Sequence, residues 1–266
     1  MRSIGTIAVA TLREHLRESG LHALIALVWL LLLAAVALAE LSAGQRLRVV
    51  TDVGLAATRL GGLCAALFLG GGVVAREVER RSATATLTAP VERWAWLLGR
   101  FGGVFLALVV LVAATGVLLF VVVAVLMVLT PQAAAAPSLL GLGLRLSPAL
   151  LLVLVEVTIV AALATMFSAF SSHLFAMVCS LGLWVAGHYA QTAAHLATNA
   201  SEAWVSALNG LLWCILPNVS VFAVATRIAH DDPVRSGEVT LALTYGVVYA
   251  AAMLAIGSGL FARRDI

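Results

Sequence analysis

The chain has 266 residues, of which 62% are hydrophobic and 11% are charged, and its formal net charge is +3. Soluble domains carry about a quarter charged residues, so this composition indicates an integral membrane protein. The Arg residues are spread over several loops instead of one face, which argues against nucleic-acid binding. All 16 Lys-plus-Arg residues are Arg. A Walker A loop requires Lys, so any ATP must be bound by another chain.

Six apolar runs are long enough to cross a membrane, which takes about 20 residues of helix. They predict an all-α integral membrane protein in the lipid bilayer, with one domain over residues 1–266. The six predicted spans are Leu21–Ala39, Val53–Ala75, Phe101–Leu129, Leu146–Phe170, Leu174–Ala190 and Leu241–Phe261.

Residues 1–20 are predicted to form an amphipathic helix in the inner membrane interface. A secretory signal peptide is the alternative, but the region is long and contains Glu14 and Glu18, unlike a short basic leader. The apolar residues at helical spacing are Ile4, Ile7, Ala8, Leu12 and Leu16.

Arginine placement predicts the orientation. With the N-terminus inside, ten Arg residues lie in cytoplasmic parts and five in outer parts, so both termini are expected in the cytoplasm. Ala203–Ala225 is also apolar, but Pro217 interrupts it, and a seventh span would put Arg263 and Arg264 outside. Residues 191–240 are therefore predicted as an outer helical hairpin between spans five and six, re-entrant or at the surface.

The segment 76–100 concentrates five Arg residues and three Glu residues between two apolar runs. Pro90 is expected to end any helix before it, and Val91–Leu98 to form a short helix with Trp94 and Trp96 at the interface. A solvated loop that obeys the positive-inside rule is the alternative. The apolar and Thr-rich stretch 83–88 favours a docking surface instead.

This segment resembles that of type-2 ABC exporter permeases, and most closely the branch of multicopper-enzyme or nitrous-oxide-reductase maturation permeases. Weaker similarities lie at Phe167–His173, at Leu216–Asn218 with Phe222, and at Phe261–Asp265. Arg100 stands where the family usually has Lys. The residues that match the segment pattern are Gly71, Glu77, Glu79, Ser82, Thr84, Leu87, Pro90, Val91, Arg93, Gly99 and Arg100.

The resemblance implies a non-catalytic permease subunit of the bacterial inner membrane, paired with a second permease subunit, identical or not. Two separate ABC ATPase subunits would bind ATP and Mg, so the chain itself needs no cofactor. Segment 76–100 would contain the coupling helix, the turn Ser171–His173 would form a smaller contact, and periplasmic or accessory proteins could join. The implied ATPase-docking residues are Glu77, Glu79, Arg81, Thr84, Leu87, Pro90 and Arg93.

Span two contains two rows of small residues at a spacing of four, which allow helix backbones to approach closely. They are predicted to pack against the second permease subunit, and packing within one subunit is the alternative. The six residues are Ala57, Gly61, Gly62, Ala65, Ala66 and Gly70.

Glu156 lies near the middle of span four, where an ionisable group is costly and therefore a functional candidate. A place on the substrate path and a structural polar contact are both open. Arg59 in span two is a possible ion-pair partner.

No metal site is expected. His188 and His195 are seven residues apart, about 10 Å along a helix and too far to hold one ion alone. The Cys residues lack metal-ligand or disulfide spacing, and are expected to be small buried side chains. They are Cys64, Cys179 and Cys214.

Three other functions fit the sequence less well. A rhomboid-like protease needs Ser before His, but the only glycine-flanked Ser, Ser258, follows every His in the chain. An ATP-independent channel or secondary transporter usually has more charges within the membrane. A structural membrane scaffold subunit stays open, and the sequence does not identify a substrate.

Overall fold

The computed structural model describes residues 2–40, 45–79, 92–129, 139–198, 216–230 and 232–262. In these ranges the chain forms eight α-helices and one 3₁₀ helix, and no described residue lies in a strand. The elements are α1 (Arg2–Arg17), α2 (Ser19–Ala39), α3 (Arg46–Glu79), α5 (Arg93–Leu129), α6 (Leu139–Ser168), α7 (His173–Thr198), η1 (Val219–Ala223), α9 (Val224–Ala229) and α10 (Ser236–Ala262).

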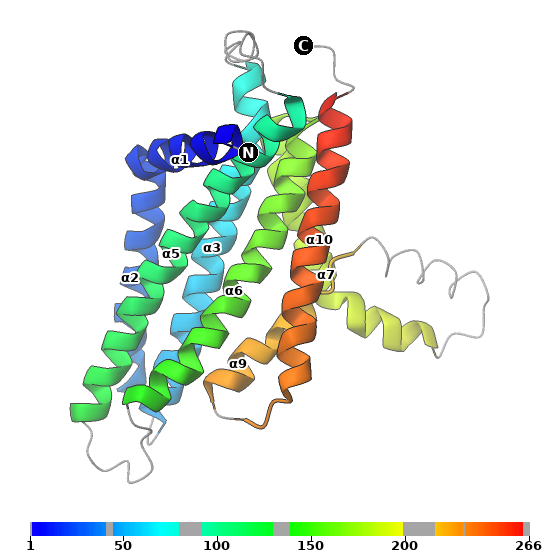
Figure 1. Ribbon diagram of the computed structural model, residues 1–266. Coiled ribbons are helices and arrows are strands. Elements are labelled where there is room, and N and C mark those ends of the chain that lie inside the picture. The colour runs from blue at the N-terminus through cyan, green and yellow to red at the C-terminus, as the bar shows by residue number, and fades with distance from the viewer. Residues whose placement is uncertain are drawn as a thin grey trace.

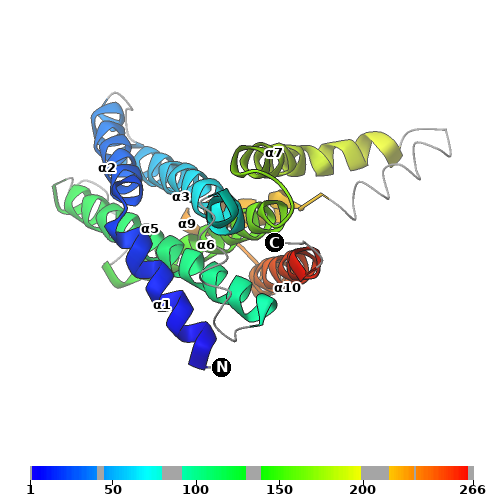
Figure 2. The ribbon, with the colours of Figure 1, turned by 90° about the horizontal axis from the view of Figure 1, so that it is seen from above.

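Five described helices are long and apolar enough to cross a membrane, namely α2, α3, α5, α6 and α10. The predicted all-helical membrane fold is confirmed, but the count of six spans is not. The apolar part of α7, His173–His188, is shorter than a full span. Beyond this part, α7 leaves the bundle sideways (Figures 1 and 2).

The long helices run side by side, and α1 lies across one end of them (Figure 1). The N-terminus and the end of α10 lie at this same end, which we call the α1 end. Seen from above, α6 is central and has α3, α5, α7 and α10 around it (Figure 2). The central position agrees with the composition of α6, which is apolar on all sides.

Helix α6 begins at Leu139, seven residues before the predicted span. Pro148 therefore lies inside the helix rather than in its first turn. Proline removes one backbone hydrogen bond, and neighbouring helices can make such a position tolerable within a membrane bundle.

Helix α1 is amphipathic as predicted, but its buried stripe differs from the expected one. Thr11 and His15 are buried, whereas Leu16 is 36% exposed. The stripe packs against the first turns of α5, so α1 is seated on protein.

The separate short helix predicted at Val91–Leu98 is wrong, because Arg93 begins α5 and the helix continues without interruption to Leu129. Trp94 is 49% exposed, as an interfacial residue would be, but Trp96 is 7% exposed and stacks on Phe261. The prediction took both indoles as interfacial since sequence alone does not show that α10 covers one of them.

Within the predicted outer hairpin, residues 191–198 continue α7, and the next described stretch begins at residue 216. Residues 216–218 are non-helical, and η1 and α9 follow them. Phe222 and Ala225 are each 1% exposed, and these elements pack against α6. One face of this part is thus packed on the bundle, while Ala223 and Arg227 are exposed. Residues 199–215, including Cys214, fall outside the described ranges.

Candidate functional site

The predicted docking residues lie mostly outside what the structure describes. Glu77 and Glu79 are in the last turn of α3, where only the backbone is described, and Arg93 begins α5. The remaining four fall in the stretch 80–91, outside the described residues: Arg81, Thr84, Leu87 and Pro90. Both flanks of this stretch lie at the α1 end (Figure 1).

The C-terminal flank of the stretch is tied to the last helix. Arg93 Nη1 donates a hydrogen bond to the backbone oxygen of Ala262, at 3.1 Å. One turn on, the rings of Trp96 and Phe261 stack with their centroids 5.6 Å apart. The positive guanidinium meets the carbonyl end of α10, where the helix dipole favours a cation.

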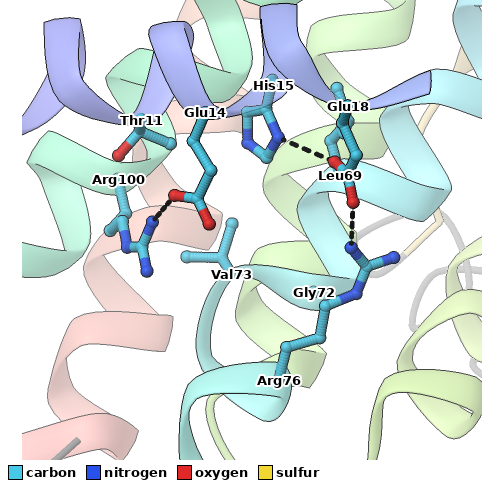
Figure 3. Close-up of a pocket in the computed structure, with 9 residues that line it drawn as sticks. All are labelled: Thr11, Glu14, His15, Glu18, Leu69, Gly72, Val73, Arg76 and Arg100. Atoms are coloured by element: carbon cyan, nitrogen blue, oxygen red, sulfur yellow. Dashed lines mark hydrogen bonds and ion pairs between the residues drawn. The ribbon is translucent and has the colours of Figure 1, made fainter. Parts of the chain in front are cut away.

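A group of charged residues joins α1 to both flanks; we call Glu14, His15, Glu18, Arg76 and Arg100 the α1 charge cluster (Figure 3). Arg100 Nη1 lies 2.7 Å from Glu14 Oε2. Arg76 Nη1 lies 3.2 Å from Glu18 Oε1, and His15 Nδ1 lies 3.4 Å from Glu18 Oε2. The Glu14 carboxylate of α1 therefore holds α5, and the Glu18 carboxylate, at the junction of α1 and α2, holds α3.

Burial lowers the pKa of His15, and the neighbouring Glu18 only partly opposes this effect. Desolvation penalises the imidazolium form, so the buried ring of His15 is neutral near neutral pH. The cluster then consists of two carboxylates and two guanidinium groups around a neutral imidazole.

His173, in the turn predicted as a second contact, lies beside the α3 flank. Its Nε2 atom is 3.4 Å from Arg76 Nη2, and its ring centroid is 6.2 Å from that of Phe68. The hydroxyl of Ser171 donates to the backbone oxygen of Phe167 at 2.6 Å, closing the turn after α6. This turn and the α3 flank therefore adjoin at the α1 end.

The small residues of α3 pack within the chain. All six that were predicted at a subunit interface are buried against the chain's own helices: Ala57, Gly61, Gly62, Ala65, Ala66 and Gly70. The alternative, packing within one subunit, is therefore what the structure shows for these residues, and they offer no open surface to a second permease.

The glycine contacts show how close this packing is. A Cβ added at Gly61 would lie 2.2 Å from Val28 of α2, and one at Gly62 would lie 2.9 Å from Val157 of α6. At Gly70 it would meet the backbone oxygen of Ala161 at 2.7 Å. Glycine is required here because α2 and α6 approach α3 closely. Sequence spacing alone does not show whether the approaching helix belongs to the same chain or to a second subunit.

Side-chain hydroxyls of α6 reinforce the same crossing near the α1 end. The buried Ser168 Oγ accepts hydrogen bonds from the backbone N–H groups of Val74 and Ala75, both at 3.0 Å. In a membrane interior such interhelical hydrogen bonds hold neighbouring helices in register.

The predicted pair of Glu156 and Arg59 exists and joins α6 to α3. Glu156 Oε2 lies 2.8 Å from Arg59 Nε, although the N–H is not aligned for a good hydrogen bond. Trp184 Nε1 of α7 donates to the other carboxylate oxygen at 3.3 Å. Glu156 is 2% exposed and Arg59 26%. Two charges far apart in the sequence thus form one polar contact among three helices.

Sequence analysis missed the α1 charge cluster and its seat. Glu14 and Glu18 are one helical turn apart, which is a readable signal, but their partners lie on distant helices. The signal for the seat is the glycine spacing at positions 99 and 103. A Cβ at Gly103 would lie 2.4 Å from Thr11 Cβ, so α1 requires glycine there.

Comparison with known families assigns almost the whole chain. Residues 6–266 match the family described as ABC-2 family transporter protein. No curated protein sequence matches the chain significantly. The family is a membrane transport component that normally carries no catalytic chemistry. With its five apolar helices long enough to span a bilayer, the chain therefore belongs to the ABC-2 transporter family, as a multi-pass membrane permease of the ABC transporter class.

Proposed function

We propose that this permease is the membrane-spanning subunit of an ATP-driven exporter or mechanotransmitter, and that segment 76–100 docks a separate ABC ATPase. The family match supports the association with an ATPase. The observation that carries the docking proposal is that both flanks of residues 80–91 are held to other helices. Arg76 contacts Glu18 at the junction of α1 and α2 and His173 of α7, and Arg93 contacts α10.

This anchoring suits a surface that transmits force. Together the two flanks are tied by polar contacts to the α1–α2 junction, to α7 and to α10, so they pass a displacement of the segment to these elements rather than absorbing it. ATP binding on the partner would then favour one of two helix arrangements through its differential contacts with them. The substrate class is not part of the proposal.

The orientation belongs to the same proposal. The Arg distribution supports a cytoplasmic location for the α1 end, in a bacterial inner membrane by this proposal, where an ATPase has access to ATP. A second permease subunit completes the assembly, and its contact surface must differ from the buried small residues of α3.

The test is photo-cross-linking at position 87, on the proposed docking segment, in native membranes. We expect the cross-linked partner to be a protein that an ATP analogue also labels. The matched control carries the same cross-linker at position 140, where Leu140 is 77% exposed on the first turn of α6, at the other end of the bundle.

A second readout uses Leu87→Arg, which should reduce co-purification of the ATPase because a charge replaces an apolar docking side chain. Arg93 is left unchanged, since its contact with Ala262 means that a substitution there would also disturb α10. If an ATPase cross-links from position 140 but not from position 87, the docking site lies elsewhere than on segment 76–100. No ATPase from either position would refute the proposal and favour a scaffold or an ATP-independent transporter.

A further inference from the structure

An apolar groove lies between α2 and α3 at the α1 end. The docking proposal uses the contact of Glu18 with Arg76 at its charged end, but not its apolar walls. Its volume is about 310 Å³, which is within the size range of ligand pockets, about 300–1,000 Å³. The wall residues are Gly20, Leu21, Ala23, Leu24, Leu27, Phe68 and Leu69, and Glu18 and Arg76 complete the lining.

The groove opens sideways, because Leu27 is 47% and Phe68 50% exposed. Both residues lie within helices suited to spanning a membrane, so the opening faces the hydrocarbon region. The end of the groove near α1 is open at Gly20, where an added Cβ would meet no atom within 4 Å. An acyl chain matches such a cleft in chemistry and in the direction of access.

The charged end of the groove presents two opposite charges side by side (Figure 3). Glu18 Oε1 and Arg76 Nη1 are 3.2 Å apart, and their side chains are 44% and 31% exposed. A guanidinium favours phosphate oxygens, and a carboxylate favours a donor with N–H groups. Adjacent phosphate and ammonium groups on one headgroup would satisfy both.

We propose that this groove binds an aminophospholipid, with an acyl chain between α2 and α3, its phosphate at Arg76 and its primary ammonium at Glu18. An anionic headgroup without an ammonium would place a second negative charge beside Glu18. A quaternary ammonium matches the charge but has no N–H to donate. The site therefore selects for the primary ammonium.

The test is native mass spectrometry of the purified full chain in detergent, without any ATPase, so its outcome is independent of the docking proposal. Phosphatidylethanolamine, phosphatidylcholine and phosphatidylglycerol with identical acyl chains are titrated separately. We expect phosphatidylethanolamine to bind about tenfold more tightly than the other two, as one added hydrogen bond between charged groups implies.

Two substitutions locate the binding. Gly20→Leu fills the groove and should remove the tight binding, whereas Gly182→Leu on α7 should not. Both glycines have free space around an added Cβ, but only Gly20 lines the groove. Glu18→Gln should equalise phosphatidylethanolamine and phosphatidylcholine. Equal binding of the three lipids to the native chain, preference for phosphatidylglycerol, or unchanged binding by the Gly20→Leu variant would each overturn the proposal.

Discussion

Among single residues, Glu156 and Arg59 stand out because they place opposite charges in the apolar interior. Glu156 is almost fully buried, and Arg59 is about a quarter exposed. A lone buried charge is costly, whereas a pair offsets much of that cost. The pair also receives a hydrogen bond from Trp184 of α7, so it joins three helices.

Glu156→Gln should lower the free energy of unfolding by up to about 3 kcal/mol, because it leaves the Arg59 cation without its counter-ion. The expected loss is moderated by the exposure of Arg59, whose side chain can reach toward more polar surroundings. Adding Arg59→Gln should restore part of the loss. Denaturant unfolding in detergent of the two single variants and the double variant measures the coupling.

Thr158→Val is the control for that cycle. Thr158 lies on the same helix, and its hydroxyl donates to the Leu154 backbone oxygen of α6 at 2.7 Å. It should change the unfolding free energy much less than Glu156→Gln does. Strict additivity of the two charge substitutions would show that Glu156 and Arg59 do not stabilise each other.

His15 predicts a pH dependence of stability. Its folded pKa is lowered by burial, so the unfolded chain takes up a proton first as the pH falls below about 6.5. Stability is therefore fully retained above that pH and decreases below it, by at most about 1.4 kcal/mol per pH unit. Glu14, Glu18, Arg76 and Arg100 surround the ring.

Thermal unfolding of the native chain and of His15→Gln, measured between pH 7.5 and 5.5, tests this effect. The neutral amide cannot take up the proton, so its stability should depend less on pH. If the two pH profiles are identical, the loss of stability at low pH comes from the carboxylates of the α1 charge cluster instead.

Among the helices, α1 has a position that depends on two glycines of α5. At Gly103 an added Cβ would lie 2.9 Å from the Ala8 backbone oxygen, and at Gly99 it would lie 2.8 Å from Ile7 Cβ. Backbone cannot rotate away as a flexible side chain can, so a larger residue must displace α1. Displacing α1 would also separate Glu14 from Arg100.

Gly103→Ala should therefore destabilise the protein by about 1–3 kcal/mol and expose α1 to trypsin at Arg13 and Arg17. The control is Gly143→Ala on α6, where the nearest atom to an added Cβ is 3.8 Å away. Alanine favours helix by up to about 1 kcal/mol over glycine, so the control should be neutral or stabilising. Equal effects of the two substitutions would mean that α1 has room to adjust.

For the molecule as a whole, α1 and α10, near the two ends of the sequence, both pack on the first turns of α5. Arg93 and Trp96 contact α10, and Arg100 contacts α1. The flank of the proposed docking segment is thereby part of the bundle rather than a free loop. A change at this flank is transmitted to both terminal helices.

Phe261→Ala should remove one of these attachments and cost about 3–5 kcal/mol, as deletion of a buried aromatic ring usually does. Phe261 is 2% exposed and stacks on Trp96, whereas the adjacent Leu260 is 38% exposed. Leu260→Ala is thus the matched control and should be much milder when both are compared by thermal unfolding. A similar loss from both would indicate that α10 is held elsewhere.

The sequence by itself determined the class of fold. Backbone groups in lipid must form their hydrogen bonds within the chain, so long apolar runs can only be helices. It also indicated the break near Pro217, the amphipathic nature of α1 and the cost of Glu156, since each depends on residues close together in the chain. Family membership follows equally from the linear pattern, which the match over residues 6–266 bears out.

Only the tertiary structure decided which faces meet. Ser168 bonds to Val74 across 94 positions, and Arg93 to Ala262 across 169. Small residues, indoles and charges look the same in sequence whether a neighbour is the same chain, another subunit or lipid. Their burial depends on helix positions set by the packing of the whole bundle. For that reason the small residues of α3, Trp96 and the α1 charge cluster acquired their roles only from the folded molecule.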